Sequence, residues 1–230
     1  MEYRVEKKYL VSDMDLMLLK NRLKCVMPRD VHQDGDSYEI RSLYFDDIWN
    51  RCMDENEAGI DQRKKFRIRT YGYKSDVIHL EIKEKLCGLT KKVACDLTKE
   101  EYNQILTNNV SLSLDERKSF NQLKIQMRCY NMQPKVIIFY ERTAFVYGPG
   151  NVRITFDRNI MASSKCDDLF KKNIPNLVPV LPTGFHVLEV KYDEFLPDFI
   201  ADQLELGTLR QTAFSKYYLG RLAVNGEFPY

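Results

Sequence analysis

Residues 63–70 carry positive charges at alternate positions, namely Arg63, Lys65, Arg67 and Arg69. Alternate residues of a β-strand point to the same face, so a strand here would collect these four charges on one side. Like charges repel one another unless a negative group lies opposite them. The pattern is typical of a solvated strand face or of a site that binds an anion. Solvated faces usually mix signs, which favours the anion site.

The other expected strands add polar positions of mostly the same sign. Together these polar faces hold eleven cations, which are Arg4, Lys8, Arg63, Lys65, Arg67, Arg69, Lys83, Lys85, Arg142, Arg153 and Lys191. Three carboxylates accompany them, Glu6, Glu81 and Glu189. The whole chain is almost balanced, with 35 Lys and Arg against 33 Asp and Glu, so positive charge is concentrated on these faces. Such segregation focuses the electric field into a site.

The kind of anion follows from the cost of burying charge. If the strands close into a barrel with these faces inward, unpaired cations would be very costly to desolvate. Chains of phosphate groups match Arg forks and Lys charges best. A nucleic acid is the weaker alternative: Tyr71 and Tyr73 follow the Arg-rich strand, but no aromatic pair stands as in RNA-binding sheets. The chain has no GxxxxGK[ST] loop, so side chains would have to hold the phosphates.

Glu189 is the most informative carboxylate. It lies in Val-Leu-Glu-Val-Lys and faces the same way as Lys191. One interpretation is a Glu–Lys pair inside the barrel. The other is a ligand for Mg²⁺ or Mn²⁺, which prefer oxygen and bridge carboxylates to phosphates. Glu6, with Glu81 as the weaker candidate, could complete such a shell, whereas His186 is interpreted as structural.

The elements that must position these residues are mainly strands. Hydrophobic alternation predicts strands over 3–10, 38–46, 63–72, 77–86, 90–96, 134–147, 151–158 and 186–193. Turn residues predict hairpins at Gly148-Pro-Gly-Asn151 and around Gly88. Helices are expected from Ser12 to about Cys25, after the capping box Thr98–Glu101, and over 115–130. Two more, broken near Gly207, are expected between 198 and 223. The sum is one antiparallel α+β domain, residues 1–230, with helices around a sheet or barrel.

Targeting signals and metal motifs are missing from the sequence. The apolar runs are far shorter than the roughly 20 residues of a membrane span, and the N-terminus is charged from its second residue. The six cysteines are scattered without a CxxC pair, which makes a close-spaced zinc site improbable and favours reduced thiols. We therefore expect a cytoplasmic protein.

The sequence resembles the VTC (vacuolar transporter chaperone) domains, a polyphosphate polymerase family within the triphosphate tunnel metalloenzyme, or CYTH-like, group. Eight stretches match in the family's order between about residues 4 and 220. They are Arg4-x-Glu6-x-Lys8-Tyr9, Arg41–Asp46, Arg63–Gly72, Leu80–Lys85, Tyr140–Phe145, Val152–Asp157, Leu188–Lys191 and Phe214–Tyr217. One such stretch would be weak, but eight in order are highly specific.

The resemblance implies a fold, a reaction and a set of site residues. The fold is an eight-stranded antiparallel β-barrel, the triphosphate tunnel, with helices packed outside. The reaction takes ATP as phosphoryl donor, needs Mn²⁺ or Mg²⁺, and makes inorganic polyphosphate. Position by position, the family's catalytic and phosphate-binding cations correspond to Lys8, Arg67, Arg69, Lys83, Arg142, Arg153 and Lys216. A further phosphate-binding lysine of the family corresponds to Lys92, with the neighbouring Lys91 as the alternative. Ser215 matches a serine near the phosphate path, and Glu189 matches the metal-binding glutamate. Arg63, Lys65, Lys85 and Lys191 are expected to bind substrate beside them, and Glu6 to assist with the metal.

Departures from the family pattern keep alternatives open. Arg4 replaces the first glutamate of the Glu-x-Glu-x-Lys pattern of the wider group, and Ala213 replaces a lysine of eukaryotic members. The SPX domain and membrane helices of those members are not found in this sequence. The sequence does not identify a membrane-anchored partner. A triphosphatase acting on inorganic or nucleoside triphosphates, and a non-catalytic polyphosphate-binding module, are the alternative functions.

Overall fold

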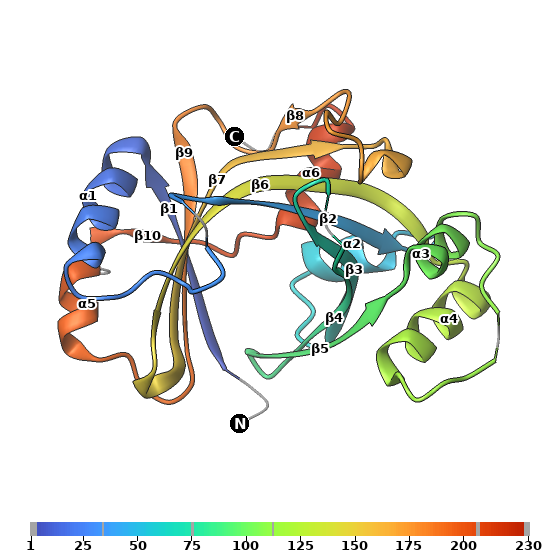
Figure 1. Ribbon diagram of the computed structural model, residues 1–230, viewed down its shortest axis with the longest axis horizontal. Coiled ribbons are helices and arrows are strands. Elements are labelled where there is room, and N and C mark those ends of the chain that lie inside the picture. Colours follow the sequence, from blue (N-terminus) through green and yellow to red (C-terminus); the bar gives the residue numbers. More distant parts are fainter. Residues whose placement is uncertain (1–3, 34, 75, 112, 206–207, 228–230) are drawn as a thin grey trace.

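The computed structural model describes residues 4–227 except 34, 75, 112, 206 and 207. The chain folds into long strands and shorter helices (Figure 1). The strands are β1 (Val5–Ser12), β2 (Tyr38–Asp46), β3 (Arg63–Tyr71), β4 (Ile78–Leu86), β5 (Leu89–Leu97), β6 (Gln133–Tyr147), β7 (Val152–Ser163), β8 (Val178–Pro179), β9 (Phe185–Tyr192) and β10 (Arg210–Gln211). The helices are α1 (Asp13–Lys24), α2 (Arg51–Glu57), α3 (Lys99–Leu106), α4 (Lys118–Tyr130), α5 (Asp198–Leu204) and α6 (Lys216–Val224), with 3₁₀ turns at Pro149–Asn151 and Cys166–Asp168.

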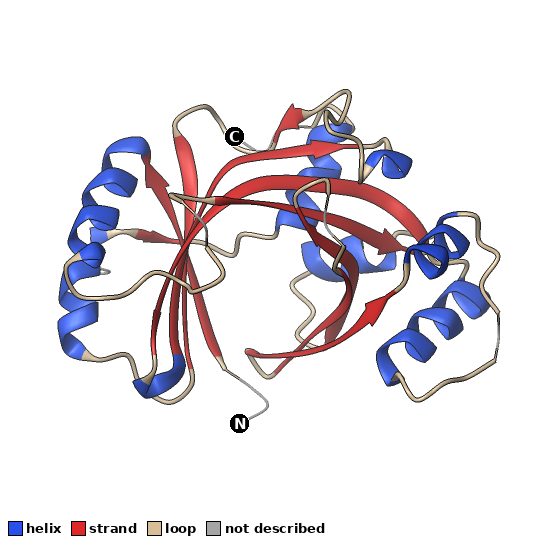
Figure 2. Ribbon diagram, viewed as in Figure 1, coloured by secondary structure: helices blue, strands red, loops and turns tan. Residues whose placement is uncertain are grey.

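The strands form one antiparallel sheet that curls into a barrel (Figure 2). Their order is β10-β1-β9-β7-β6-β2-β3-β4-β5, with β8 beside β7. The eight long strands close where β1 meets β5, through an isolated bridge in which the Arg4 N–H donates to the Thr90 carbonyl at 3.4 Å. The predicted fold class, an α+β antiparallel tunnel with eight long strands, is confirmed. A continuous ladder does not form at this closure, because β10 pairs with Tyr9 and Leu10 and so occupies part of the β1 edge.

Both predicted hairpins are present. β6 and β7 are joined through Gly148–Asn151, and β4 and β5 turn at Cys87 and Gly88, which both have positive φ (50° and 74°). Two positive φ values in a two-residue loop suit the twist of the flanking strands. The short elements α2, β8 and β10 were not predicted, and β7 runs five residues further than the expected 158. The predicted break at Gly207 lies outside the described residues, but α5 and α6 are separate helices as expected.

Helices pack against the apolar residues on the outer faces of the strands. Tyr9 and Val11 of β1 pack with Leu16 and Leu23 of α1, which lies beside α5. The predicted start of α1 is confirmed by a capping box between Ser12 and Asp15. On the other side of the molecule, outward residues of β3 and β4 form a second core with α3 and α4 (Figure 1). Because side chains alternate along a strand, the polar residues between them face the barrel interior.

Helix α6 lies differently from the outer helices. Gly220 sits so close to β6 that a Cβ there would be 2.2 Å from the Ile138 Cδ1 atom. Ile138 alternates with Tyr140 and Arg142, whose side chains line the barrel interior. The first two residues of α6, Lys216 and Tyr217, line the interior as well. The helix therefore packs against the inner faces of β6 and β7 and brings its N-terminus to the site.

His186 is structural, as predicted, because its buried ring bonds through Nε2 to Asp13 of α1 at 2.7 Å. Among the described residues, no helix combines the length and apolarity needed to cross a bilayer.

Candidate functional site

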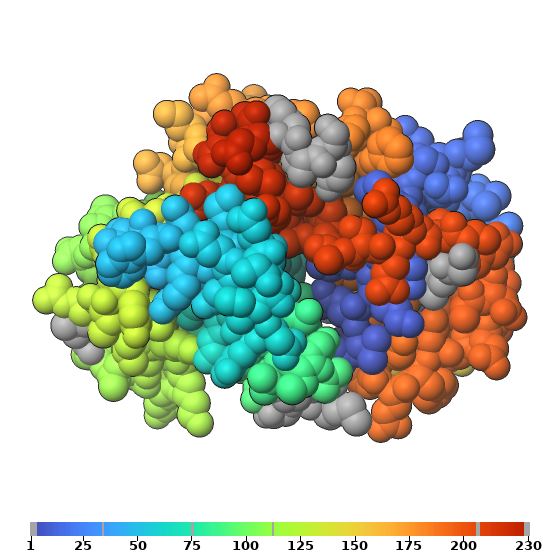
Figure 3. Space-filling model, turned by 180° about the vertical axis from the view of Figure 1, so that it is seen from behind, coloured from blue at the N-terminus to red at the C-terminus, as the bar shows by residue number. Residues whose placement is uncertain are grey.

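The barrel encloses a cavity of about 1280 Å³. Seen from behind, the molecule is hollowed between the segment around β3–β5 (cyan to green), the N-terminal strand (blue) and the C-terminal segment (red) (Figure 3). Three carboxylates, Glu6, Asp30 and Glu189, are among the described residues that line it. Thirteen cations line it with them: Arg4, Lys8, Arg63, Lys65, Arg67, Arg69, Lys83, Lys85, Lys92, Arg142, Arg153, Lys191 and Lys216. All eleven cations of the polar strand faces thus lie in one cavity, joined by Lys92 and Lys216.

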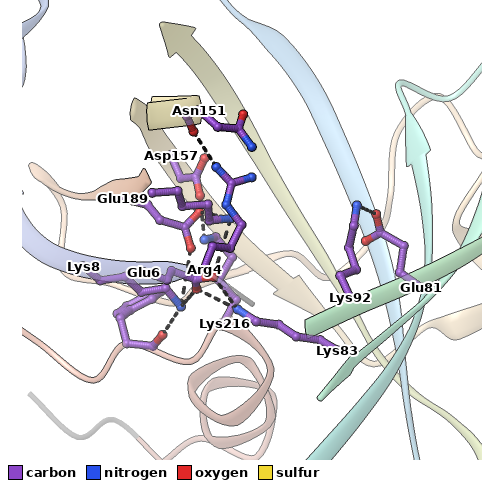
Figure 4. A network of polar contacts seen from close by, with 12 residues as sticks. Arg4, Glu6, Lys8, Glu81, Lys83, Lys92, Asn151, Asp157, Glu189 and Lys216 are labelled. Atoms are coloured by element: carbon purple, nitrogen blue, oxygen red, sulfur yellow. Dashed lines mark hydrogen bonds and ion pairs between the residues drawn. The ribbon is translucent and has the colours of Figure 1, made fainter. Parts of the chain in front are cut away.

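Glu6 of β1 and Glu189 of β9 converge on the same two lysines, Lys8 and Lys191. Figure 4 shows Lys8 beside the two carboxylates. Lys8 Nζ lies 3.4 Å from Glu6 Oε1 and 3.8 Å from Glu189 Oε1. Lys191 Nζ lies 3.0 Å from Glu189 Oε2 and 3.7 Å from Glu6 Oε2. The antiparallel register of β1 and β9 causes this convergence, since it sets Lys8 opposite Glu189 and Glu6 opposite Lys191. Lys83 of β4 reaches across the barrel closure and donates to Glu6 at 2.6 Å.

These neighbours hold both carboxylates ionised. Burial alone would raise the pKa of Glu189, but Lys191, Lys8 and Lys216 hold it well below its usual value. Burial and Glu189 likewise act to raise the pKa of Glu6, and Lys191, Lys83 and Lys8 outweigh them and lower it. Lys83 shows the opposite balance, because burial lowers its pKa to about 7 despite the nearby Glu6. Its side chain is 31% exposed, and that exposed part faces the cavity.

Glu81 does not join this pair, which corrects the expectation that it could complete a metal shell. Its buried carboxylate accepts hydrogen bonds from Arg67 Nε at 2.7 Å and Lys92 Nζ at 2.9 Å, and Arg69 lies 3.6 Å away. Figure 4 shows Glu81 and Lys92 apart from the Glu6 group. These cations overcome the effect of burial and lower the pKa of Glu81 strongly. Glu81 therefore acts as a fixed anchor for arginines on the next strand.

Asp157 is a site residue that the sequence did not single out. It is fully buried and accepts two hydrogen bonds from Arg142, at 2.6 and 2.7 Å, and Lys216 lies 2.6 Å from its Oδ2. Burial opposes ionisation, but Arg142 and Lys216 lower the pKa of Asp157 to about 2. Its alternation with Arg153 and Thr155 along β7 was the available signal, because these three positions share the inward face.

Tyr140 was quoted within a matching stretch but given no role. Its buried hydroxyl accepts from Arg69 Nη2 at 3.2 Å, and its ring lies under Lys216 Nζ, 4.9 Å from the ring centroid. Burial would raise its pKa, but Arg69, Arg142 and Lys216 lower it. Tyr140 thus links three cations of the cavity wall.

The C-terminal segment brings Ser215 to the cavity. Ser215 caps α6 by accepting from the Tyr218 N–H, and Lys65 donates to the same hydroxyl at 2.8 Å. Lys8 donates to the Phe214 carbonyl at 2.8 Å. Burial and the neighbouring Lys8 and Arg63 lower the pKa of Lys65 well below its usual value. Through its hydrogen bonds from Lys8 and Lys65, the C-terminal segment links β1 to β3 across the barrel.

The remaining expected residues lie around the rim of this centre. Arg63 donates to the Ile60 carbonyl, and Arg153 pairs with Asp30 and donates to the Tyr38 hydroxyl at 3.3 Å. Lys85 lies opposite Arg63 in the ladder. Lys92 faces the cavity and lies opposite Lys83, whereas its competitor Lys91 lies opposite Glu84 on the other face.

Glu6 and Glu189 could supply two of the oxygen ligands of a hard divalent cation. Within the described residues, no group of three or more Asp, Glu, His or Cys side chains comes together. Mg²⁺ is commonly held by one or two carboxylates, with water and substrate phosphates as the other ligands. Two converging carboxylates in a cationic cavity fit that mode, in which the ion enters with a phosphate ligand.

The fold and cavity define an antiparallel tunnel protein with a cationic interior. The model of the VTC domain family matches residues 3–225, and the chain belongs to this family. Solved structures of the tunnel group share the fold. A putative adenylyl cyclase from Hippeastrum, described as having a dominant triphosphatase activity, is 13% identical with a TM-score of 0.58, covering 99% of this chain and 97% of that one.

Two bacterial structures align in the same way. A putative adenylate cyclase from Bacillus halodurans is 15% identical with a TM-score of 0.53, over 94% of this chain and 96% of that one. A putative adenylate cyclase from Vibrio parahaemolyticus is 14% identical, also with a TM-score of 0.53, and the alignment covers 95% of this chain and 97% of that one. A search of curated protein sequences found no match. At these identities the likeness extends to the fold alone.

Proposed function

We propose that this protein is a polyphosphate polymerase that transfers the γ-phosphate of ATP to a growing inorganic polyphosphate chain. The observation that carries the proposal is the cavity lining, with thirteen cations against three carboxylates among its described residues. A cavity of this charge needs a polyanion, and linear phosphate chains present oxygens along their whole length. Membership of the VTC domain family supports the same substrate class.

We assign each cation of the cavity a role in this reaction. Lys8, Arg67, Arg69 and Lys83 clamp the triphosphate of ATP, with Lys65 and Lys92 beside them. Arg142, Arg153 and Lys216 hold the terminal phosphate of the acceptor chain in line with the transferring group. That terminal oxygen is already anionic, so the reaction needs no general base. Positioning and charge neutralisation supply most of the catalysis in such transfers.

Glu189 and Glu6 are the residues that would hold Mn²⁺ or Mg²⁺. Such an ion neutralises negative charge on phosphate oxygens when it is bound. The protein's own part is to keep both carboxylates ionised, which Lys8 and Lys191 do.

The test is to incubate purified protein with γ-labelled ATP and Mn²⁺ and to separate the products on a gel. We expect a metal-dependent ladder of long labelled chains together with ADP. Glu189→Ala should abolish the ladder. Glu84→Ala is the matched control and should retain it, because Glu84 lies on the outer face of β4, 3.5 Å from Lys64. Circular dichroism of both variants checks that they are folded.

Other products would favour the alternatives. Label found only as orthophosphate would identify a triphosphatase, the activity described for the Hippeastrum structure. Tight binding of polyphosphate without turnover would identify a binding module. Binding of single-stranded nucleic acid that needs no metal and weakens steeply with salt would overturn the choice of polyanion.

A further inference from the structure

Three rings lie together at the edge of the cavity, where β2 begins, β3 ends and β4 begins. The ring centroids of Tyr38 and Tyr71 are 6.1 Å apart, and those of Tyr71 and His79 are 6.0 Å apart at an interplanar angle of 82°. All three line the cavity. The ladder places them there, since it sets Tyr71 opposite Ile40 of β2 and His79 opposite Arg69 of β3. Tyr38, Tyr71 and His79 are called the aromatic rim below.

The central ring of this rim is left open to the cavity. Tyr71 is 43% exposed, whereas Tyr140 in the same cavity is 1% exposed. The flanking rings are held in place, because the Tyr38 hydroxyl accepts from Arg153 at 3.3 Å and His79 Nδ1 lies 2.6 Å from Asp96 Oδ1. An exposed ring between two fixed rings, inside a concave site, is a surface that a flat ligand can cover.

Guanidinium groups stand next to the rim. Arg69 precedes Tyr71 by two residues on the same face of β3, a separation of about 7 Å along the strand. Arg142 lies opposite Tyr38 in the β2–β6 ladder, and Arg153 bonds to the Tyr38 hydroxyl. A ligand whose flat group lies on the rim would therefore extend its anionic part onto Arg69 of the triphosphate clamp, beside the two arginines that we assign to the acceptor phosphate. A nucleoside triphosphate has this layout, with a base at one end and phosphates at the other.

We propose that the aromatic rim is the subsite for the nucleobase of a nucleoside triphosphate donor. This inference rests on the proposed function, since it names the part of the donor that the phosphate clamp does not hold. Stacking on aromatic rings tolerates every base, because each base has a π-face. The rim therefore selects nucleotides over inorganic phosphate chains, which have no group to place on it.

Calorimetric titration tests the subsite without turnover. The two ligands are a non-hydrolysable ATP analogue and inorganic tripolyphosphate, each titrated into the full chain and its variants. We expect Tyr71→Ala to weaken binding of the ATP analogue by about fivefold or more, which is the loss of affinity expected when one base–aromatic stack is removed. Tripolyphosphate binding should change by less than about twofold, because the arginines and lysines remain. Tyr71→Phe keeps the ring and should bind both ligands like the wild type.

Tyr130→Ala is the matched control, because Tyr130 is similarly exposed, at 39%, but lies at the end of α4 outside the cavity lining. Equal losses for both ligands in Tyr71→Ala, or no loss for either, would overturn the subsite. Wild-type protein that binds tripolyphosphate as tightly as the analogue would also overturn it, while the phosphate site would stand. Wild-type protein that binds neither ligand would instead refute the proposed function.

Discussion

Arg142 and Asp157 form a buried, two-pronged ion pair between neighbouring strands, with Nε–Oδ1 at 2.6 Å and Nη2–Oδ2 at 2.7 Å. Arg142 is 6% exposed and Asp157 is not exposed at all. The fork geometry orients the guanidinium, and Lys216 binds the same carboxylate from α6. One buried acid therefore positions two of the cations that we assign to the acceptor phosphate. Glu81 likewise positions Arg67 and Lys92, which we assign to the triphosphate of ATP.

Replacing Asp157 by Asn should destabilise the fold strongly. The variant removes the buried carboxylate that both Arg142 and Lys216 contact and leaves Glu189, 3.7 Å from Arg142, as their remaining anionic neighbour. Breaking a buried ion pair by removing one partner typically costs about 3–5 kcal/mol of unfolding free energy. Urea unfolding followed by circular dichroism measures the loss. Asp193→Asn is the control, because its pair with Arg4 is part-exposed and should contribute no more than about 1 kcal/mol. Similar small losses in both variants would contradict the anchoring role of Asp157.

Removing the Arg67 side chain should impair phosphate transfer more than it impairs folding. Arg67 bonds to Glu81 and to the Tyr44 hydroxyl, which hold its guanidinium in the cavity. If its charged hydrogen bonds act on the transition state, Arg67→Ala should lower turnover by a factor of about 10 to 150, or about 1.5–3 kcal/mol. The measurement is the initial rate of ADP release. Lys64→Ala, on the outer face of the same strand, should leave that rate within about twofold, since surface substitutions have small effects. If Arg67→Ala turned over at the wild-type rate, Arg67 would not be part of the triphosphate clamp.

Binding of phosphate chains should depend on the charge of Lys83. Burial lowers the pKa of Lys83 to about 7, and Glu6, Lys8, Lys191 and Glu189 are the charged neighbours that modify it. Lys83 is therefore mainly charged below about pH 7 and mainly neutral above it. An anionic chain binds the charged form, so affinity for tripolyphosphate should fall as pH rises through 7.

Titrations between pH 6 and 9 on wild type and Lys83→Arg measure this effect. Arginine stays charged, so the variant should lose less affinity across the range, and the ligand's own titration is common to both proteins. The same pKa shift affects stability. The folded pKa lies below the unfolded one, so the unfolded chain binds more protons between about pH 7 and 10.4 and stability should rise with pH in that window. Identical binding profiles for the two proteins would show that Lys83 does not titrate near 7.

Ser215 should contribute to the stability of the fold. Its hydroxyl caps α6 and accepts a hydrogen bond from Lys65. Ser215→Ala should reduce the unfolding free energy by about 1 kcal/mol, the usual value of an N-cap. Ser215→Asn preserves a cap and should recover most of that stability. Thermal unfolding of the three proteins separates these cases, and an Asn variant as unstable as the Ala variant would argue against the capping role.

Much of the barrel could be read from the sequence because its signals are local. Alternation places residues of one strand on opposite faces whatever the strand pairs with, so Arg67 and Phe66 could be assigned to the interior and the core from their positions alone. Turn chemistry is equally local, and both hairpins formed where Gly88 and Gly150 indicated them. The concentration of cations on one face also required nothing beyond the order of residues.

Tertiary structure decided which charges meet. Glu81 and Glu189 were both candidate metal ligands in the sequence, yet ladder register places one between Arg67 and Lys92 and the other beside Glu6. Asp157 became an anchor because α6 brings Lys216 to it from 59 positions further along the chain. Register and helix docking depend on contacts between residues far apart in the chain, whereas strand alternation is a property of the backbone itself. The sequence alone therefore determined the charge of the interior, and the folded barrel determined its internal pairing and the position of its aromatic rim.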